Sequence, residues 1–92
     1  MNIVQTTSFK RAVKKLHKNQ KLDLDKAIKA IVKDPGIGDD KVGDLSGISV
    51  HKFKMAKQLA LLAYSYEDQL ITLTLLALGT HENFYRDLKK SK

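Results

Sequence analysis

The chain has 92 residues, a formal net charge of +7 and no cysteine. A chain of this length forms one domain with a modest core, and the lack of cysteine excludes disulfides, thiolate metal sites and cysteine nucleophiles. No apolar run approaches the roughly 20 residues that span a bilayer, and the polar start of the chain is unlike a signal peptide. We therefore expect a single cytoplasmic domain over residues 1–92. Its excess positive charge either serves solubility or meets a polyanion, and RNA is the polyanion that we favour.

The first half of the chain is predicted to hold one strand and two helices. Ile3–Thr6 is short and β-branched, as in a first strand, and Ser8 is placed to cap the helix that follows. Apolar residues recur at helical spacing over 9–16 and again over 24–32, until a Pro-Gly pair ends the pattern. The short break around Asn19 then predicts an antiparallel helical hairpin.

The second half is predicted to hold three strands and a last helix. The strands are expected over residues 48–55, 59–66 and 70–78. A short polar link over 67–69 predicts that the last two form a hairpin. Gly79 ends the third strand and a helix follows over 80–90, with inward-facing Phe84, Tyr85 and Leu88. The predicted fold is α+β: an N-terminal strand and a helical hairpin packed on one face of an antiparallel sheet, whose other face is open, then a short C-terminal helix.

The strand His51–Met55 carries the first candidate site residues. Side chains alternate across a strand, so Phe53 and Met55 share the face of the helices, and His51 lies in the same register. Lys52 and Lys54 then stand about 7 Å apart on the open face. Two neighbouring ammonium groups favour an anion between them, although an exposed strand face is also commonly just polar.

The second candidate is His81, in the first turn of the predicted last helix. The helix dipole there favours anions and disfavours a protonated imidazole. A neutral imidazole beside free backbone N–H groups suits phosphate binding and proton transfer. Tyr85 follows four residues later on the same helical face. The simpler interpretation is that His81 caps the helix and Tyr85 belongs to the core.

Other kinds of site find little support in the sequence. The three histidines are scattered and lack the spacing of a helical metal site. The glycines match neither nucleotide-binding fingerprint, and no serine stands in a nucleophile elbow. We expect no metal and no cofactor. The lysine-rich first helix is more typical of a solvated face than of a membrane-binding or DNA-binding one.

Across essentially its whole length the chain resembles the RelE/ParE superfamily of toxins from bacterial type II toxin–antitoxin systems. Four segments carry the resemblance: Gly43-Asp44-Leu45-Ser46-Gly47, Val50-His51-Lys52-Phe53-Lys54, Leu62-Ala63-Tyr64, and Leu78-Gly79-Thr80-His81-Glu82-Asn83-Phe84-Tyr85-Arg86-Asp87-Leu88. The last block, placed after a hairpin, is the most specific, and its Gly-Thr-His favours the RelE/YafQ-like branch. The resemblance implies a single toxin domain that acts in the cytoplasm.

The resemblance also implies a reaction. RelE-like toxins bind the ribosomal A site and cut the mRNA there without a metal, because the mRNA 2′-hydroxyl attacks the adjacent phosphate. By matching position, Lys52 and Lys54 would stabilise the phosphate, His81 would transfer a proton, and Tyr85 would stack on a base or orient the substrate. A cognate antitoxin, acidic or partly disordered, would wrap the basic surface.

One departure from the RelE pattern keeps other functions open. RelE has an arginine on the next strand, whereas Gln58–Ala63 holds no cation here. Lys57 in the turn or Arg86 on the last helix would have to bind the RNA phosphates in its place. The gap supports the alternative to the favoured mRNA endonuclease, a ParE-like toxin that poisons DNA gyrase without nuclease activity. A binding module that represses its own operon together with a partner is the third interpretation.

Overall fold

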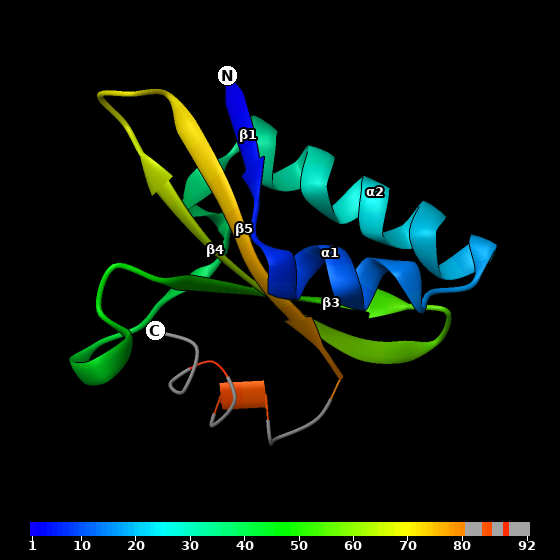
Figure 1. The fold of residues 1–92 in the computed structure, drawn as a ribbon. Coiled ribbons are helices and arrows are strands. Elements are labelled where there is room, and N and C mark those ends of the chain that lie inside the picture. The colour runs from blue at the N-terminus through cyan, green and yellow to red at the C-terminus, as the bar shows by residue number, and fades with distance from the viewer. Residues whose placement is uncertain (81–83, 86–87, 89–92) are drawn as a thin grey trace.

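A mixed sheet with the strand order β1-β5-β4-β3-β2 forms the centre of the computed structural model (Figure 1). The structure describes residues 1–80, 84, 85 and 88. Its strands are β1 (Asn2–Gln5), β2 (Asp39–Asp40), β3 (Ser49–Met55), β4 (Gln58–Glu67) and β5 (Thr72–Gly79). Its helices are α1 (Thr7–Lys14) and α2 (Lys18–Lys33), and short 3-10 turns are η1 (Pro35–Ile37) and η2 (Gly43–Leu45). No helix in this described part is long and apolar enough to cross a membrane.

The predicted α+β fold is confirmed, but the sheet is mixed rather than antiparallel. β3, β4 and β5 form the expected antiparallel meander. β1 joins the far side of β5 in parallel, which makes the sheet mixed. Sequence periodicity does not report this pairing, because the two strands are separated by most of the chain.

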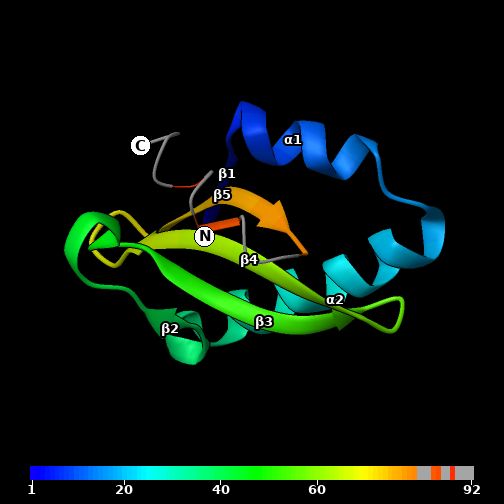
Figure 2. The same ribbon diagram turned by 90° about the horizontal axis from the view of Figure 1, so that it is seen from below.

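Both helices pack on one face of the sheet (Figures 1 and 2). The main core lies between the helices and the sheet, and it consists of Phe9, Leu24, Ile31, Met55, Ala60, Leu62, Tyr64, Leu73 and Leu75. Burial of these side chains supplies the main stabilisation, at about 25 cal/mol for each Å² of apolar surface removed from water. The helical hairpin is thus held by the stripe of apolar residues from which it was predicted.

Thr6 starts the first helix and ties it to the sheet. Its Oγ1 accepts a hydrogen bond from the Phe9 N–H at 3.1 Å and donates one to the Leu76 carbonyl at 2.6 Å. The prediction that Ser8 caps this helix was therefore wrong, since Ser8 lies inside α1. Thr6 caps the helix instead, because it lies three residues before Phe9, whose N–H has no acceptor within the helix, and because its hydroxyl also reaches β5.

The second face of the sheet is partly covered, which corrects the prediction of an open face. A second buried cluster lies there, made of Leu45, Ile48, Val50, Leu61, Ala63, Phe84 and Leu88. The reason is that β3 and β4 carry apolar residues on both faces, and the apolar residues of each face are stabilised by burial against another element. Phe84 and Leu88, each 5% exposed, point inward as predicted. Phe84, Tyr85 and Leu88 are helical, and the rest of the predicted last helix lies outside the described residues.

Tyr64 fastens the link between α2 and β2 onto the sheet. Its buried hydroxyl donates to the Pro35 carbonyl at 2.6 Å and accepts from the Gly38 N–H at 3.0 Å. Gly38 has no room for a side chain, because a Cβ there would lie 2.7 Å from the Tyr64 Oη. Burial raises the pKa of the Tyr64 phenol, against the opposing effect of the Gly38 hydrogen bond. The phenol therefore stays protonated and able to donate.

Replacing Tyr64 with Phe tests this fastening. The Tyr64→Phe variant leaves a carbonyl and an N–H without their partner, so the free energy of unfolding should fall by about 1–3 kcal/mol. Urea denaturation followed by circular dichroism measures the change. Tyr66→Phe on the same strand is the control and should change stability by less than about 0.5 kcal/mol. Equal stability of the two variants would contradict the role given to Tyr64.

Candidate nucleic-acid interface

The strand register places Lys52 and Lys54 on the face of the sheet opposite the helices. Lys52 stands opposite Leu61, and Lys54 stands opposite Leu59. Directly opposed residues of antiparallel strands share a face, and Leu61 belongs to the second cluster. Both lysines are exposed. This is the placement that alternation along the strand predicts.

The same register aligns the end of β5 with Lys52, with β4 between them. Leu61 pairs with Gly79 as well as with Lys52, so these three residues form a row across β3, β4 and β5. Phe84 packs on Gly79, where a Cβ would lie only 2.6 Å from the Phe84 Cδ1. The chain therefore leaves the sheet two strands away from Lys52. His81 and Arg86 lie outside the described residues, and their roles stay predictions.

Tyr85 lies on this second face and contacts a cation that the sequence did not reveal. Its half-buried ring packs against the second cluster and meets the Phe84 ring edge to face, with centroids 5.4 Å apart. The Lys41 Nζ stands 5.2 Å from the centre of the Tyr85 ring. Nothing in the pattern around Lys41 signals this contact, because it joins residues 44 positions apart.

Lys57 lies at the tip of the β3–β4 hairpin, in an unusual turn. Both turn residues, Ala56 and Lys57, have left-handed backbones, with φ of 52° and 71°. Such turns normally use Asn or Gly. The Asp23 Oδ2, on α2, accepts the Ala56 N–H at 2.8 Å and so fastens the turn to the helices. Asp23 thereby sets where the exposed Lys57 projects.

The contribution of Asp23 can be measured by removing its carboxylate. Asp23→Ala leaves a partly buried N–H without an acceptor in a strained turn, and should lower the free energy of unfolding by about 1–2 kcal/mol. Asp25→Ala is the matched control, because its 3.9 Å ion pair with Lys29 is exposed and contributes about 0.5 kcal/mol or less. Thermal denaturation compares the two. A smaller effect at Asp23 than at Asp25 would show that the turn does not depend on the helix.

His51 is separated from the two lysines by the sheet itself. It faces the helix side, opposite Leu62, and its ring stacks on Phe53 with centroids 5.8 Å apart. Burial lowers the pKa of the His51 imidazole. The side chain is therefore neutral at pH 7 and is a packing residue rather than part of the lysine face.

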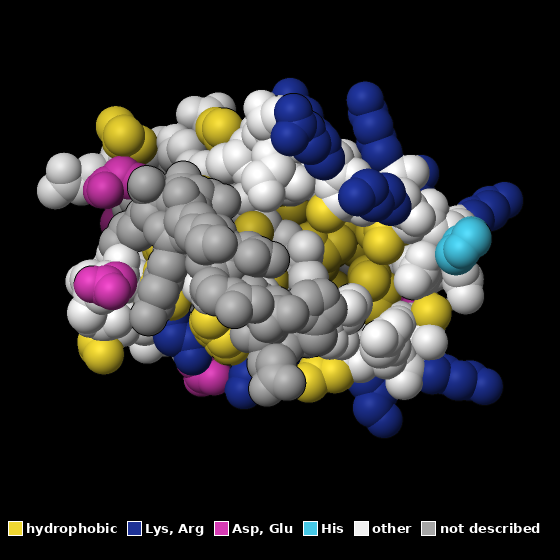
Figure 3. Space-filling model, turned by 60° about the horizontal axis from the view of Figure 1, so that its bottom comes forward, with side chains coloured by type: hydrophobic (Ala, Val, Ile, Leu, Met, Phe, Trp, Pro, Cys, Tyr) yellow, Lys and Arg dark blue, Asp and Glu magenta, His cyan; other side chains and the backbone are white. Residues whose placement is uncertain are grey.

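Several basic side chains gather on α1, on the face that Figure 3 shows. In Figure 3 dark blue side chains gather over α1 and at the right-hand end of this face, and others lie at its lower edge beside a magenta one. The exposed cations of α1 and its end are Lys10, Arg11, Lys14 and Lys15. A group of positive charges of this kind attracts a polyanion.

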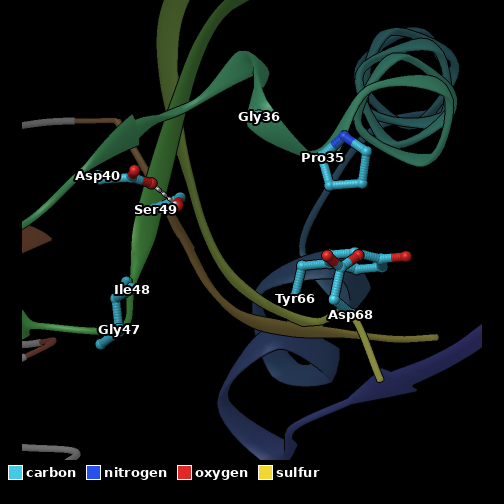
Figure 4. A pocket seen from close by; sticks show the side chains of 8 residues that line it. All are labelled: Pro35, Gly36, Asp40, Gly47, Ile48, Ser49, Tyr66 and Asp68. Atoms are coloured by element: carbon cyan, nitrogen blue, oxygen red, sulfur yellow. Dashed lines mark hydrogen bonds between the residues drawn. The ribbon is translucent and has the colours of Figure 1, made fainter. Parts of the chain in front are cut away.

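A separate hollow of about 610 Å³ does not suit a nucleic acid. It lies between η1, the start of β3 and the turn after β4 (Figure 4), and its lining is Pro35, Gly36, Asp40, Gly47, Ile48, Ser49, Tyr66 and Asp68. The Asp40 Oδ1 accepts a hydrogen bond from the Ser49 hydroxyl at 2.7 Å. Two carboxylates repel phosphate, so the lysine face is the better candidate interface. Among the residues described, no three His, Asp or Glu side chains gather as metal ligands.

Comparison with solved structures identifies the class of fold as RelE-like. A mutant of the E. coli toxin RelE in the free state superposes on this chain with a TM-score of 0.75 at 16% identity. The superposition covers 98% of this chain and 95% of the RelE chain. The Mycobacterium tuberculosis RelBE2 toxin–antitoxin complex gives 0.68 at 18% identity, with 87% and 96% covered. A YoeB/ParE toxin from Agrobacterium tumefaciens gives 0.70 at 16% identity, with 89% and 100% covered. These identities establish the shared fold alone.

The family follows from the sequence comparison. The family model described as the ParE-like toxin of type II bacterial toxin-antitoxin system matches residues 3–89. The chain therefore belongs to this family and to the RelE/ParE superfamily of toxins. No curated protein matches the sequence.

Proposed function

We propose that this toxin is a ribosome-dependent mRNA endonuclease that inhibits translation without a metal or cofactor. The observation that carries the proposal is the row from Lys52 through Leu61 to Gly79. Lys52 and Lys54 lie on the face against which Tyr85 packs, and the row ends at Gly79, two residues before His81. A cationic face with an aromatic ring is suited to a single RNA strand, because it binds phosphate and stacks on bases.

The chemistry assigns a role to each side chain. The 2′-hydroxyl of one nucleotide attacks the adjacent phosphorus, the bond to the next 5′-oxygen breaks, and a 2′,3′-cyclic phosphate and a 5′-hydroxyl result. Lys52 and Lys54 neutralise the charge that builds up on the phosphate oxygens. His81 moves the proton between the attacking and leaving oxygens. Tyr85 orients the substrate.

Lys57 and Arg86 are proposed to bind the flanking RNA backbone. Lys57 has the position for this task, since it projects from the hairpin tip next to the strand that carries Lys54. Phosphate contacts of this kind hold the register of the RNA without reading its bases. Cleavage on the ribosome would occur in the cytoplasm.

The partner that we propose is an antitoxin. Two similar structures, from E. coli and Mycobacterium tuberculosis, are toxin–antitoxin complexes. The net charge of +7 favours an acidic segment that folds as it binds.

A gyrase poison is the second candidate, and one observation favours it. The residues of β4 opposite Lys54 and Lys52 are Leu59 and Leu61, so β4 adds no cation to the face. Loss of one charge-assisted phosphate contact lowers a rate by about 10²-fold or more. A non-nuclease toxin has no need of that contact.

A double substitution tests the nuclease proposal. Lys54→Ala together with His81→Ala removes a phosphate contact and the proton-transfer group, which should lower the cleavage rate by about 10⁴-fold or more. The measurement is primer extension on mRNA bound to purified ribosomes. Lys33→Ala, an exposed residue on α2, is the charge-loss control and should cleave normally.

The outcome separates the two candidates. Full cleavage by the folded double variant would overturn the assigned site. Intact mRNA with the unmodified toxin, combined with trapped gyrase–DNA cleavage complexes, would replace the nuclease with the gyrase poison. Circular dichroism establishes that the variants remain folded.

A further inference from the structure

Lys41 is held by its backbone at the edge of the second face. It directly follows β2, whose two residues pair with Ser49 and Val50 of β3. The Lys41 N–H donates to the Ile48 carbonyl at 2.9 Å, and Ile48 is buried in the second cluster. The position of Lys41 is therefore set by the sheet and the core, and not by a free loop.

The side chain of Lys41 is directed at the ring that the proposed function needs. Its Nζ lies 5.2 Å from the centre of the Tyr85 ring, and the chain is half-buried. The carboxylate of the preceding Asp40 is engaged by the Ser49 hydroxyl at 2.7 Å. A contact between an ammonium and a tyrosine ring is weaker than one between an ammonium and a phosphate. An RNA phosphate can therefore take this ammonium without breaking a strong bond.

Lys41 also brings a positive charge to a face on which β4 carries none. Leu59 and Leu61 occupy the β4 positions opposite Lys54 and Lys52. Lys57 lies beyond one end of β3, at the hairpin tip, whereas Lys41 lies beside the other end, next to Asp40, the residue that pairs with Ser49. The two lysines of β3 are thus flanked by a further cation at each end, and the one next to Tyr85 is Lys41.

We propose that Lys41 is a phosphate-binding residue of the RNA site, which forms one nucleotide subsite together with Tyr85. The ring of Tyr85 receives a base, and the Lys41 ammonium receives the phosphate of that nucleotide. Lys41 adds to the positive charge that Lys52 and Lys54 give to this face. This inference rests on the proposed function and extends it to a residue outside the superfamily resemblance.

The test measures binding of labelled protein to two kinds of ribosome. One carries an mRNA whose A-site codon is 2′-O-methylated and cannot be cut; the other carries an mRNA that ends in the P site. Lys41→Met keeps the length and the contact with the ring and removes only the charge. Its affinity for the first ribosome should fall about tenfold, and the slope of log K against log salt should decrease by about 0.7. Binding to the second ribosome should be unchanged.

Three controls make each outcome decisive. Lys41→Arg should retain the affinity and the salt slope, because it retains the charge. Lys33→Met, with the same loss of charge on α2, should show no difference between the two ribosomes. Tyr85→Leu should weaken binding without changing the slope. If Lys41→Met and Lys33→Met show the same affinities and salt slopes, the role of Lys41 is overturned and the proposed function is not affected. A wild-type protein that does not distinguish the two ribosomes would overturn the proposed function as well.

Discussion

The alternation of side chains along β3 is the constraint on which the rest of the molecule depends. Phe53 and Met55 must pack against the helices, since Met55 belongs to the main core and Phe53 packs onto it. Lys52 and Lys54 then have only the other face available. A shift of one residue in the β3–β4 register would bury both ammonium groups under α2 and expose the core residues. The apolar core therefore decides where the cationic face lies.

The antiparallel meander turns this local alternation into a site. Because Lys52, Leu61 and Gly79 are in one row, the end of β5 is aligned with Lys52 across β4. The apolar residues of β3 and β4 on the second face draw in Phe84 and Leu88. Tyr85 is carried along between them and meets Lys41. Packing of the second cluster thus positions the aromatic group of the proposed RNA site.

Much of this arrangement could be predicted from the sequence, because it depends on local periodicity. The helical hairpin, the three meander strands and the faces of Lys52 and Lys54 all follow from spacings of 3.6 and 2 residues. The features that were missed depend on contacts between distant segments. Thr6 caps α1 while bonding a carbonyl 70 residues away, and Lys41 meets a ring 44 positions later. No local pattern encodes either contact.

Mapping of mRNA ends in cells tests the central claim, that the β3 face cuts RNA, most directly. The unmodified toxin would be induced briefly without an antitoxin, and primer extension would then locate new 5′ ends on several abundant transcripts. The nuclease account predicts sharp ends at one fixed position within codons, confined to translated regions. Intact transcripts in cells whose growth has stopped would contradict it.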